Sequence, residues 1–287
     1  MLKKFAATCT IGVFLMAAVF NTQVLAAQKN DKAEVDDSDS ANGYVSVRIV
    51  KDTSKVLKVR VSKDGRDYSY FLSNDKKFNK YPLQMGNGKY SIKVLENVEG
   101  TKYSVLMTDD INVTLKDQFA PFKTSHVLVN YDNAPNTVAA AKNLTAASKT
   151  TLDQIEAVGT YIINNVVYDT DLANKISSGA ITSYVPNVDA IYKTNKGICF
   201  DYSSLFASML RSKGIPTRLV MGYVAPNNVY HAWNEVYIPD VGWVTLSGQI
   251  YFDGKNWSRM DTTFAAGNSD ISKFVGDGKN YQVTDIY

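Results

Sequence analysis

The chain has 287 residues, of which 45% are hydrophobic and 21% charged, and its formal net charge is +3. This composition excludes a disordered polypeptide, and the length is sufficient for two domains. So small a net charge does not indicate a basic surface, and we expect no nucleic-acid partner.

The first 26 residues have the pattern of a secretory signal peptide. Lys3 and Lys4 precede an apolar run over residues 11–20, and small residues precede a cleavage point before Ala27. The apolar run is too short to span a membrane comfortably. We therefore expect no transmembrane segment and a secreted, extracellular protein, with association with the cell wall as an open alternative.

Removal of residues 1–26 would leave one cysteine, Cys199, and two histidines, His126 and His231. A single cysteine cannot close an internal disulfide, and an exposed thiol is a liability in an oxidising compartment unless it has a function. Because no paired spacing of metal ligands occurs, we expect no metal site and no cofactor.

The N-terminal half is predicted to be a β-sandwich-like domain. Residues 27–42 are polar and acidic, which predicts a disordered leader. Residues 43–118 then contain six or seven short alternating segments separated by turn residues, which is typical of a sandwich. This domain either binds a surface ligand or simply packs on the second domain.

Residues 119–135 are predicted to link the two halves, with His126 in a structural role, and residues 136–287 form the second domain. This domain begins with helical patterns, one of them starting at Thr150 with an early acid at Asp153. Apolar strand patterns follow the helices, and this order predicts an α+β domain with a helix packed on a sheet.

Cys199 lies at the start of an apolar-periodic segment that Gly214 ends. The free N–H groups and the positive end of a helix dipole favour a thiolate, which is the nucleophilic form of cysteine. A small buried core cysteine is the alternative interpretation, and it is the commoner fate of a free cysteine.

A strand pattern 32 residues later carries His231, and its alternation places Trp233 and Glu235 on the same side. Residues 257–263 are predicted to form a strand that could lie beside it and carry Asp261. A thiol, an imidazole and a carboxylate in this order can provide a nucleophile, its base and the group that orients the base.

Three segments resemble the transglutaminase-like superfamily of cysteine enzymes: Gly197-x-Cys199, the run from His231 to Tyr237, and Trp257-x-x-x-Asp261-x-Thr263. The resemblance covers about residues 136–264 and implies a papain-like fold. It also implies that Cys199 is the nucleophile, His231 the general base and Asp261 the orienting acid.

One feature departs from the family pattern. Many relatives carry the acid directly after the strand that follows the histidine, four residues after a tryptophan. The first such tryptophan here is Trp243, and Ser247 occupies the position of the acid. We interpret residues 242–255 as an inserted hairpin that displaces the acid-bearing strand to Asp261. Asp240 and Asp253 compete with it, although each lies beside a turn-forming residue; a dyad without an acid is a further alternative.

Four other polar residues have two interpretations each. Asp201 is either a first-turn acid that complements the helix dipole or part of the site, and Glu235 either supports His231 or lies on the sheet surface. Tyr184 and Tyr192 either line the cleft near the thiol or belong to the core.

These observations predict a secreted cysteine enzyme that transfers acyl groups from peptide or glutamine carboxamides through a thioester, by crosslinking or by hydrolysis. Its expected substrate is a protein or a cell-wall peptide. The main alternative is a catalytically inactive binding or scaffold protein at the cell surface, and a purely structural secreted module is the third possibility.

Overall fold

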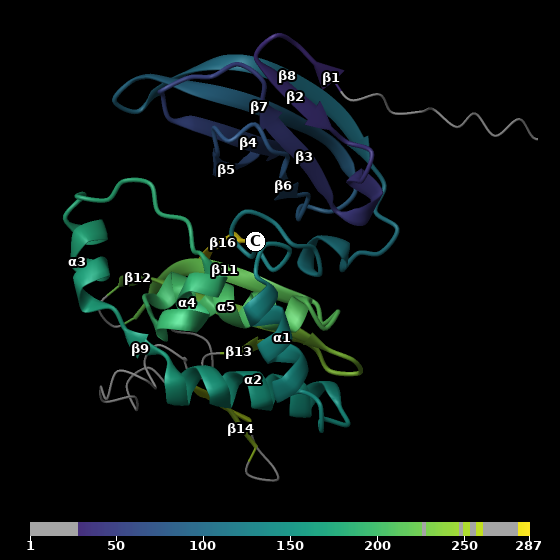
Figure 1. The fold of residues 1–287 in the computed structure, drawn as a ribbon. Coiled ribbons are helices and arrows are strands. Elements are labelled where there is room, and N and C mark those ends of the chain that lie inside the picture. Colours follow the sequence, from purple (N-terminus) through teal and green to yellow (C-terminus); the bar gives the residue numbers. More distant parts are fainter. Residues whose placement is uncertain (1–27, 226–227, 247–248, 253–256, 261–280) are drawn as a thin grey trace, which may run out of the picture.

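The computed structural model describes residues 28–225, 228–246, 249–252, 257–260 and 281–287. Two domains are stacked on each other, with an all-β domain above a domain of helices and a sheet (Figure 1). The signal peptide prediction for residues 1–26 lies outside the described residues. No helix within the described ranges is long and apolar enough to cross a membrane.

The first domain consists of two antiparallel sheets. Their strand orders are β1-β2-β3-β6 and β5-β4-β7-β8. The strands are β1 (Gln28–Lys29), β2 (Ala33–Asp36), β3 (Tyr44–Ile49), β4 (Leu57–Lys63), β5 (Arg66–Leu72), β6 (Asn79–Pro82), β7 (Gly88–Glu99) and β8 (Lys102–Val113). The predicted sandwich is therefore confirmed, although β7 and β8 are twelve residues long and not short.

The prediction of a disordered leader over residues 27–42 is wrong from Gln28 onward. Ala33 and Val35 are fully buried, and β2 pairs with β3 in the order Val35 opposite Val47. Two small apolar residues that alternate with acids are enough for a half-buried strand, because the neighbouring strand supplies the rest of the core. Glu34 forms an ion pair with Arg48 on the outer face at 2.6 Å.

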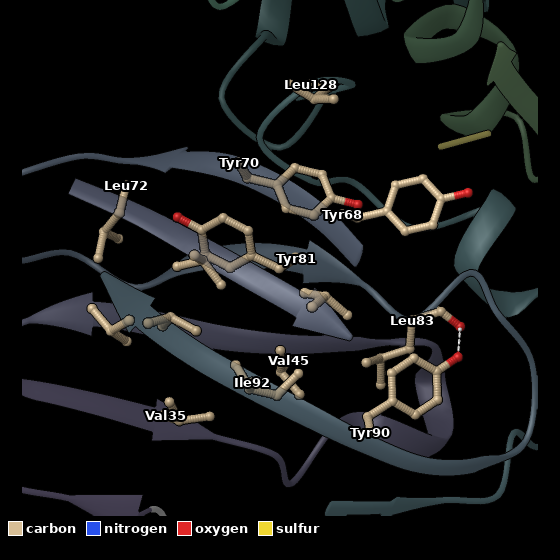
Figure 2. Close-up of a cluster of buried hydrophobic side chains, with 14 of the residues drawn as sticks. Val35, Val45, Tyr68, Tyr70, Leu72, Tyr81, Leu83, Tyr90, Ile92 and Leu128 are labelled. Atoms are coloured by element: carbon tan, nitrogen blue, oxygen red, sulfur yellow. Dashed lines mark hydrogen bonds between the residues drawn. The ribbon is translucent and has the colours of Figure 1, made fainter. Parts of the chain in front are cut away.

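The core of the sandwich contains several buried tyrosines among aliphatic side chains (Figure 2). Their hydroxyl groups bond to nearby polar groups: Tyr90 donates to Leu83 O at 3.0 Å and Tyr81 donates to Phe71 O at 3.1 Å. A buried tyrosine needs such a partner, because an unpaired hydroxyl in an apolar core is costly.

In the described part of the second domain, five helices accompany a sheet with the order β13-β12-β11-β16. The helices are α1 (Pro135–Leu144), α2 (Thr151–Asn165), α3 (Thr170–Ser177), α4 (Val188–Thr194) and α5 (Cys199–Arg211). The strands are β9 (Val167–Tyr168), β10 (Lys196–Gly197), β11 (Thr217–Val224), β12 (Val229–Ile238), β13 (Gly242–Leu246), β14 (Gln249–Phe252), β15 (Trp257–Met260) and β16 (Tyr281–Ile286). Short 3-10 helices lie at Ser40–Asn42 and Ala120–Phe122.

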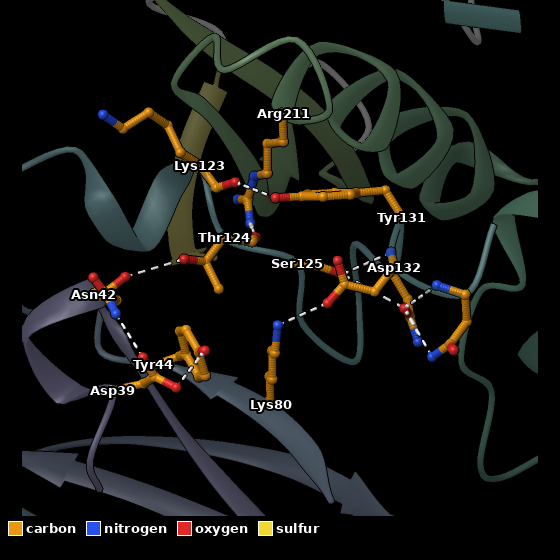
Figure 3. A network of polar contacts seen from close by, with 12 residues as sticks. Asp39, Asn42, Tyr44, Lys80, Lys123, Thr124, Ser125, Tyr131, Asp132 and Arg211 are labelled. Carbon is orange, nitrogen blue, oxygen red and sulfur yellow. Dashed lines mark hydrogen bonds and ion pairs between the residues drawn. The ribbon is translucent and has the colours of Figure 1, made fainter. Parts of the chain in front are cut away.

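Arg211 joins the two domains at the C-terminal end of α5. Its guanidinium donates to Thr217 O at 2.8 Å, to Thr124 O at 2.8 Å and to Tyr287 O at 2.9 Å. Thr124 in turn donates to Asn42 O in the sandwich domain (Figure 3). Three segments that are far apart in sequence are thus bonded to one buried side chain.

The chain returns to the domain interface at β16, which pairs with β11. Tyr287 follows β16, and its ring packs edge-on against Tyr68 and Tyr70 of the sandwich at centroid distances of 5.4 and 5.6 Å. Arg66 donates to Thr284 O at 2.8 Å. The sheet of the second domain is therefore in direct contact with the first domain.

Candidate active site

Helix α5 begins at Cys199, and Asp201 fixes that start. Ile198 has an extended conformation with φ −97° and ψ 177°, and its N–H donates to Asp201 Oδ2 at 2.8 Å. The first helical N–H groups have no intrahelical partner, so a carboxylate at this position stabilises the helix start. A Cβ on Gly197 would lie 2.5 Å from Asp201 Cβ, so only glycine fits beside this acid.

Asp201 is fully buried and is not a solvent-facing first-turn acid. Tyr184 donates its hydroxyl to Asp201 Oδ1 at 2.7 Å. Burial raises the pKa of the Asp201 carboxyl, and the hydrogen bonds from Ile198 and Tyr184 partly offset that shift. Tyr184 thus bonds to the residue that supports the start of the Cys199 helix. Tyr192, in contrast, packs against Tyr161 with a centroid distance of 5.9 Å.

Two contacts fix the direction of α5 on the sheet. Asn234 Nδ2 donates to Ser203 O at 3.1 Å near the beginning of the helix, and Arg211 bonds to Thr217 O at its end. Thr217 pairs with Val236, so the end of α5 lies at the end of β12. The beginning of α5, with Cys199, consequently lies toward the His231 end of β12.

Two tyrosines lie within electrostatic range of Cys199, which is partly exposed. Burial raises the pKa of Tyr168 to about 12, and the charges of Cys199 and Asp201 add to the shift. Burial also raises the pKa of Tyr230, with Cys199 among the smaller causes. Neither tyrosine was predicted as a site residue, although Tyr230 precedes His231 and Tyr168 lies in a segment that resembles the approach to the active-site helix in transglutaminase-like chains.

His231 is buried in β12, where only 4% of its surface is exposed. Its ring lies parallel to that of Trp233, with centroids 6.4 Å apart and an interplanar angle of 17°. Gly222 lies opposite His231, and a Cβ there would approach Trp233 Cη2 to 2.9 Å and Gln282 O to 2.1 Å. Glycine at this position therefore leaves space for the indole beside the imidazole.

Alternation along β12 sorts its residues between two sides. Asn234 and Val236 face α5, since Asn234 bonds to Ser203 and Val236 packs in the cluster of α5 side chains. His231 and Trp233 lie on the other side by the same alternation. Among the described residues, β13 pairs with β12 from Asn234 to Ile238.

Glu235 belongs to the sheet surface and not to the Cys199 end of the site. Its carboxylate forms an ion pair with Arg218 at 2.9 Å, and the Arg218 guanidinium lies over the Trp243 ring at 3.8 Å. Asp240 has φ +65° in the turn between β12 and β13, which agrees with its interpretation as a turn residue. Asp253 lies outside the described residues.

The predicted inserted hairpin over residues 242–255 needs a correction. β13 is a regular neighbour of β12, and the separate hairpin is β14 with β15. The prediction that residues 257–263 could lie beside the histidine strand is therefore wrong for the described part, because β15 pairs with β14. Trp243 lies in β13, an ordinary strand of the sheet, which its sequence position alone did not distinguish from an insertion. Asp261 lies outside the described residues.

Residues 138–262 match the model of the Transglutaminase-like superfamily. The match begins in α1, ends just after β15 and includes Cys199 and His231. This region is a transglutaminase-like domain. The predicted resemblance and the predicted fold class, a β-sandwich-like domain followed by a transglutaminase-like α+β domain, are both confirmed.

Two curated relatives share part of the chain. The chain is 33% identical over 133 residues to the uncharacterized protein YebA of Bacillus subtilis, a match over 40% of this chain and 18% of that protein. It is 34% identical over 70 residues to a protein-glutamine gamma-glutamyltransferase of Pseudomonas aeruginosa, over 20% of this chain and 10% of that protein. The chain thus spans less than a fifth of either relative.

Solved structures resemble the chain only distantly. A putative cysteine protease from Cytophaga hutchinsonii aligns with a TM-score of 0.38 and 16% identity, over 92% of this chain and 81% of that chain. The periplasmic domain of TgpA from Pseudomonas aeruginosa aligns with a TM-score of 0.36 and 14% identity, over 84% and 98%. At these values the family assignment depends on the match of residues 138–262.

The second histidine lies outside the transglutaminase-like domain. His126 is buried, and its Nδ1 accepts from Leu128 N at 3.3 Å, while its Nε2 has no partner. Burial lowers the pKa of His126 well below its usual value, and the charge of Arg211 lowers it further. This agrees with the structural role expected for it. Within the described ranges no group of three or more acidic, His or Cys side chains could hold a metal ion.

Proposed function

We propose that this chain is a secreted cysteine enzyme that transfers an acyl group from a protein or cell-wall peptide carboxamide through a thioester on Cys199. The observation that carries the proposal is the packing of α5 on β12, which brings the helix start with Cys199 toward the His231 end of the strand. A partly exposed thiol at a helix start, with a histidine toward the same end of the neighbouring strand, suits nucleophilic catalysis.

The proposal makes one geometric demand on the site. Because His231 alternates with the residues that face α5, its imidazole has to reach the thiol past the edge of β12. Trp233, packed against the ring, would restrict its orientation.

In the first step, Cys199 Sγ attacks the carbonyl carbon of the carboxamide while His231 takes the thiol proton. The backbone N–H of Cys199 is a candidate donor to the oxyanion. The C–N bond then breaks, and His231 passes its proton to the departing nitrogen, which leaves as ammonia or as an amine. A thioester between the acyl group and Cys199 remains.

In the second step, an amine or a water molecule attacks the thioester carbon, and His231 accepts the proton from that nucleophile. The C–S bond breaks and the thiol is regenerated. A lysine amine as nucleophile gives a crosslinked product, whereas water gives an acid. We propose Asp261 as the acid that orients His231, and we assign Asp201 to the support of the helix start.

The first test measures the reactivity of Cys199 itself. The rate of alkylation by iodoacetamide should exceed that of free cysteine at neutral pH, and His231→Ala should shift its pH profile. Asp240→Asn is a matched control, because it removes an acid from a turn of the same strand pair. A thiol that reacts no faster than free cysteine would overturn the proposal.

The second test measures turnover with a labelled primary amine and peptides that contain glutamine. Incorporated amine would indicate crosslinking, and ammonia without incorporation would indicate hydrolysis. Cys199→Ala should abolish turnover, and His231→Ala should lower it by about a hundredfold or more. Asp261→Asn with full activity would remove Asp261 from the proposal and leave a Cys–His dyad.

The alternative of a catalytically inactive binding or scaffold protein makes the opposite prediction. It expects no turnover and no difference between the wild type and Cys199→Ala in any acyl-transfer assay. Export can be tested separately, by asking whether the chain appears outside the producing cell with Ala27 at its N-terminus.

A further inference from the structure

A cleft of about 370 Å³ lies where the sandwich, the segment after it and the segment before α4 meet. Eleven described residues line it, and none of them is charged. Its walls are apolar at Phe71, Leu72, Val127, Val185 and Val188, and four asparagine side chains supply most of its polar groups. In Figure 1, the connection between α3 and α4 rises toward β5 on this side of the molecule.

The four asparagines use only half of their hydrogen-bonding groups within the protein. Asn130 Oδ1 accepts from Asn133 N at 3.2 Å, and Asn187 Oδ1 accepts from Ala190 N at 3.1 Å. Asn79 Nδ2 donates to Lys77 O at 2.9 Å. Among the described residues, no partner bonds to the amide NH₂ of Asn130 or Asn187, or to Oδ1 of Asn79 or Asn133. The cleft thus offers both free donors and free acceptors.

One wall of the cleft continues directly into the candidate active site. Val185 follows Tyr184, whose hydroxyl donates to Asp201 Oδ1 and whose ring packs against Phe200 with a centroid distance of 6.5 Å. Phe200 is the neighbour of Cys199 in the first turn of α5 and also contacts the core cluster of the sandwich. A chain that occupies the cleft would therefore lie beside the segment that supports the thiol.

We propose that this interdomain cleft binds an extended, uncharged stretch of the substrate polypeptide. In the substrate sequence, this stretch is separated from the carboxamide that reacts with Cys199. An extended peptide offers one N–H and one C=O per residue, which matches the free amide donors and acceptors. The inference rests on the proposed function only in assuming that the bound peptide is the substrate of Cys199. Binding of the peptide in the cleft does not require acyl transfer.

The lining favours a peptide over a carbohydrate. Sugar rings are commonly held against open aromatic faces, and Phe71 is the only aromatic residue among those that line the cleft. The ammonium of Lys58 lies 5.6 Å from the centroid of that ring. Small aliphatic walls suit peptide side chains, and none of the described residues that line the cleft carries a charge that could compensate a charged side chain for its lost hydration.

The experiment uses the Cys199→Ala chain, so that binding is measured without turnover. The probe is a fluorescent nonapeptide of Gly, Ser, Gln and Val with blocked ends, and its anisotropy reports binding. The test variant adds Asn130→Asp and Asn187→Asp. Aspartate keeps the oxygen that accepts from Asn133 or Ala190, so the local fold is retained while the free NH₂ donors are lost.

The matched control adds Asn143→Asp and Asn174→Asp, which introduce the same charge at exposed positions outside the cleft. We expect the neutral peptide to bind the Cys199→Ala chain and the control equally, and the test variant at least tenfold more weakly. A peptide with two glutamates in place of glutamines should also bind at least tenfold more weakly.

Three results would overturn the proposal: equal binding by the test variant and the control, no binding of the neutral peptide at millimolar concentration, or binding of chitotetraose without any binding of peptide. Iodoacetamide reactivity of Cys199 in the chain with Asn130→Asp and Asn187→Asp should stay within twofold of the wild type. A slow thiol with normal peptide binding would reject the proposed function alone.

Discussion

Helix α5 carries a buried charge at each end, and the two charges are stabilised differently. Asp201 at the beginning accepts from two groups, Ile198 N and Tyr184 Oη, that lie within 17 residues of it. Arg211 at the end donates to three carbonyls, those of Thr124, Thr217 and Tyr287. The first arrangement is local and the second gathers distant parts of the chain.

The different contacts at the two ends of α5 correspond to two structural roles of the helix. The local contacts at the beginning fix the position of Cys199, whereas the contacts at the end fix the second domain against the first. Lowering the pH should also change the stability contributed by the two ends in opposite directions. The pKa of Asp201 is raised, so acid favours the folded state there, whereas the pKa of His126, near Arg211, is lowered, so acid disfavours it. The predictions for Arg211, Asp201 and His126 each perturb one end, whereas Lys80→Ala removes an exposed ion pair away from both ends.

Arg211→Met is expected to have the largest effect. The substitution keeps the aliphatic stem but removes the guanidinium donor from three carbonyls, of which Tyr287 O still accepts from Leu219 N. Burial lowers the pKa of Arg211 to about 9. We expect the free energy of unfolding to fall by about 3–5 kcal/mol, measured in urea. Lys213→Met removes the same charge from an exposed position two residues later and should change it little. A loss below about 1 kcal/mol for Arg211→Met would contradict its bridging role.

Asp201→Ala should rank second. It removes the acceptor for Ile198 N–H and the partner of Tyr184, and a loss of about 1–3 kcal/mol is typical for such a buried cap. Asp201→Asn keeps one acceptor and should cost less. Urea titrations of both variants between pH 4 and 7 provide the measurement.

The difference in unfolding free energy between the wild type and Asp201→Asn should depend on pH in a definite direction. Since the folded pKa of Asp201 is raised, the native state holds its proton more tightly, and the wild type loses stability as pH rises from about 3.8 through that pKa. The stability advantage of the wild type over Asp201→Asn should therefore narrow as pH rises. A difference that widens with pH would mean that the carboxylate, and not the acid, is the favoured form.

His126 should give the third and opposite effect. Its folded pKa lies below 6.5, so its contribution to stability is present above pH 6.5 and is lost as pH falls. The wild type should lose up to about 1.4 kcal/mol between pH 6.5 and 5.5 relative to His126→Asn, which keeps an acceptor for Leu128 N. Parallel stability curves for the two proteins would show that His126 does not titrate in this way.

The smallest effect is expected for Lys80→Ala. Lys80 forms an ion pair with Asp132 at 2.8 Å between the sandwich and the following segment (Figure 3), but both side chains are well exposed to solvent. Such pairs contribute about 0.2–1 kcal/mol and weaken with salt. A larger loss that persists in 1 M salt would assign the pair a structural role comparable to that of Arg211.

Local signals predicted the elements around the site correctly. Thr150 and Asp153 form the expected helix start, with Asp153 N donating to Thr150 Oγ1 at 3.1 Å and Asp153 Oδ2 accepting from Thr150 N at 2.9 Å. The helix that begins at Cys199 and the two strands after it also occur as predicted. Capping and periodicity act over a few residues, so they can be read from the sequence directly.

The remaining features depend on partners far along the chain. The polar composition of residues 27–42 did not predict β2. Ala33 and Val35 are buried in the folded domain, where β2 pairs with β3. Nothing near Arg211 in sequence indicates that its donors meet Thr124 and Tyr287. Likewise, the position of Asp201 predicted an interaction with the helix dipole, whereas its hydrogen bond from Tyr184 joins residues 17 apart and could not be predicted from position alone.

The position of β16 has a consequence for synthesis of the protein. Thr284 accepts from Arg66, a separation of 218 residues, and the β11–β16 pairing closes a loop of about sixty residues. Such distant pairings form slowly, because the loop entropy is lost before the contacts are gained. On the ribosome, one edge of the sheet that carries His231 remains unpaired until residues 281–286 emerge, and a chaperone that covers this edge would protect the nascent chain from aggregation.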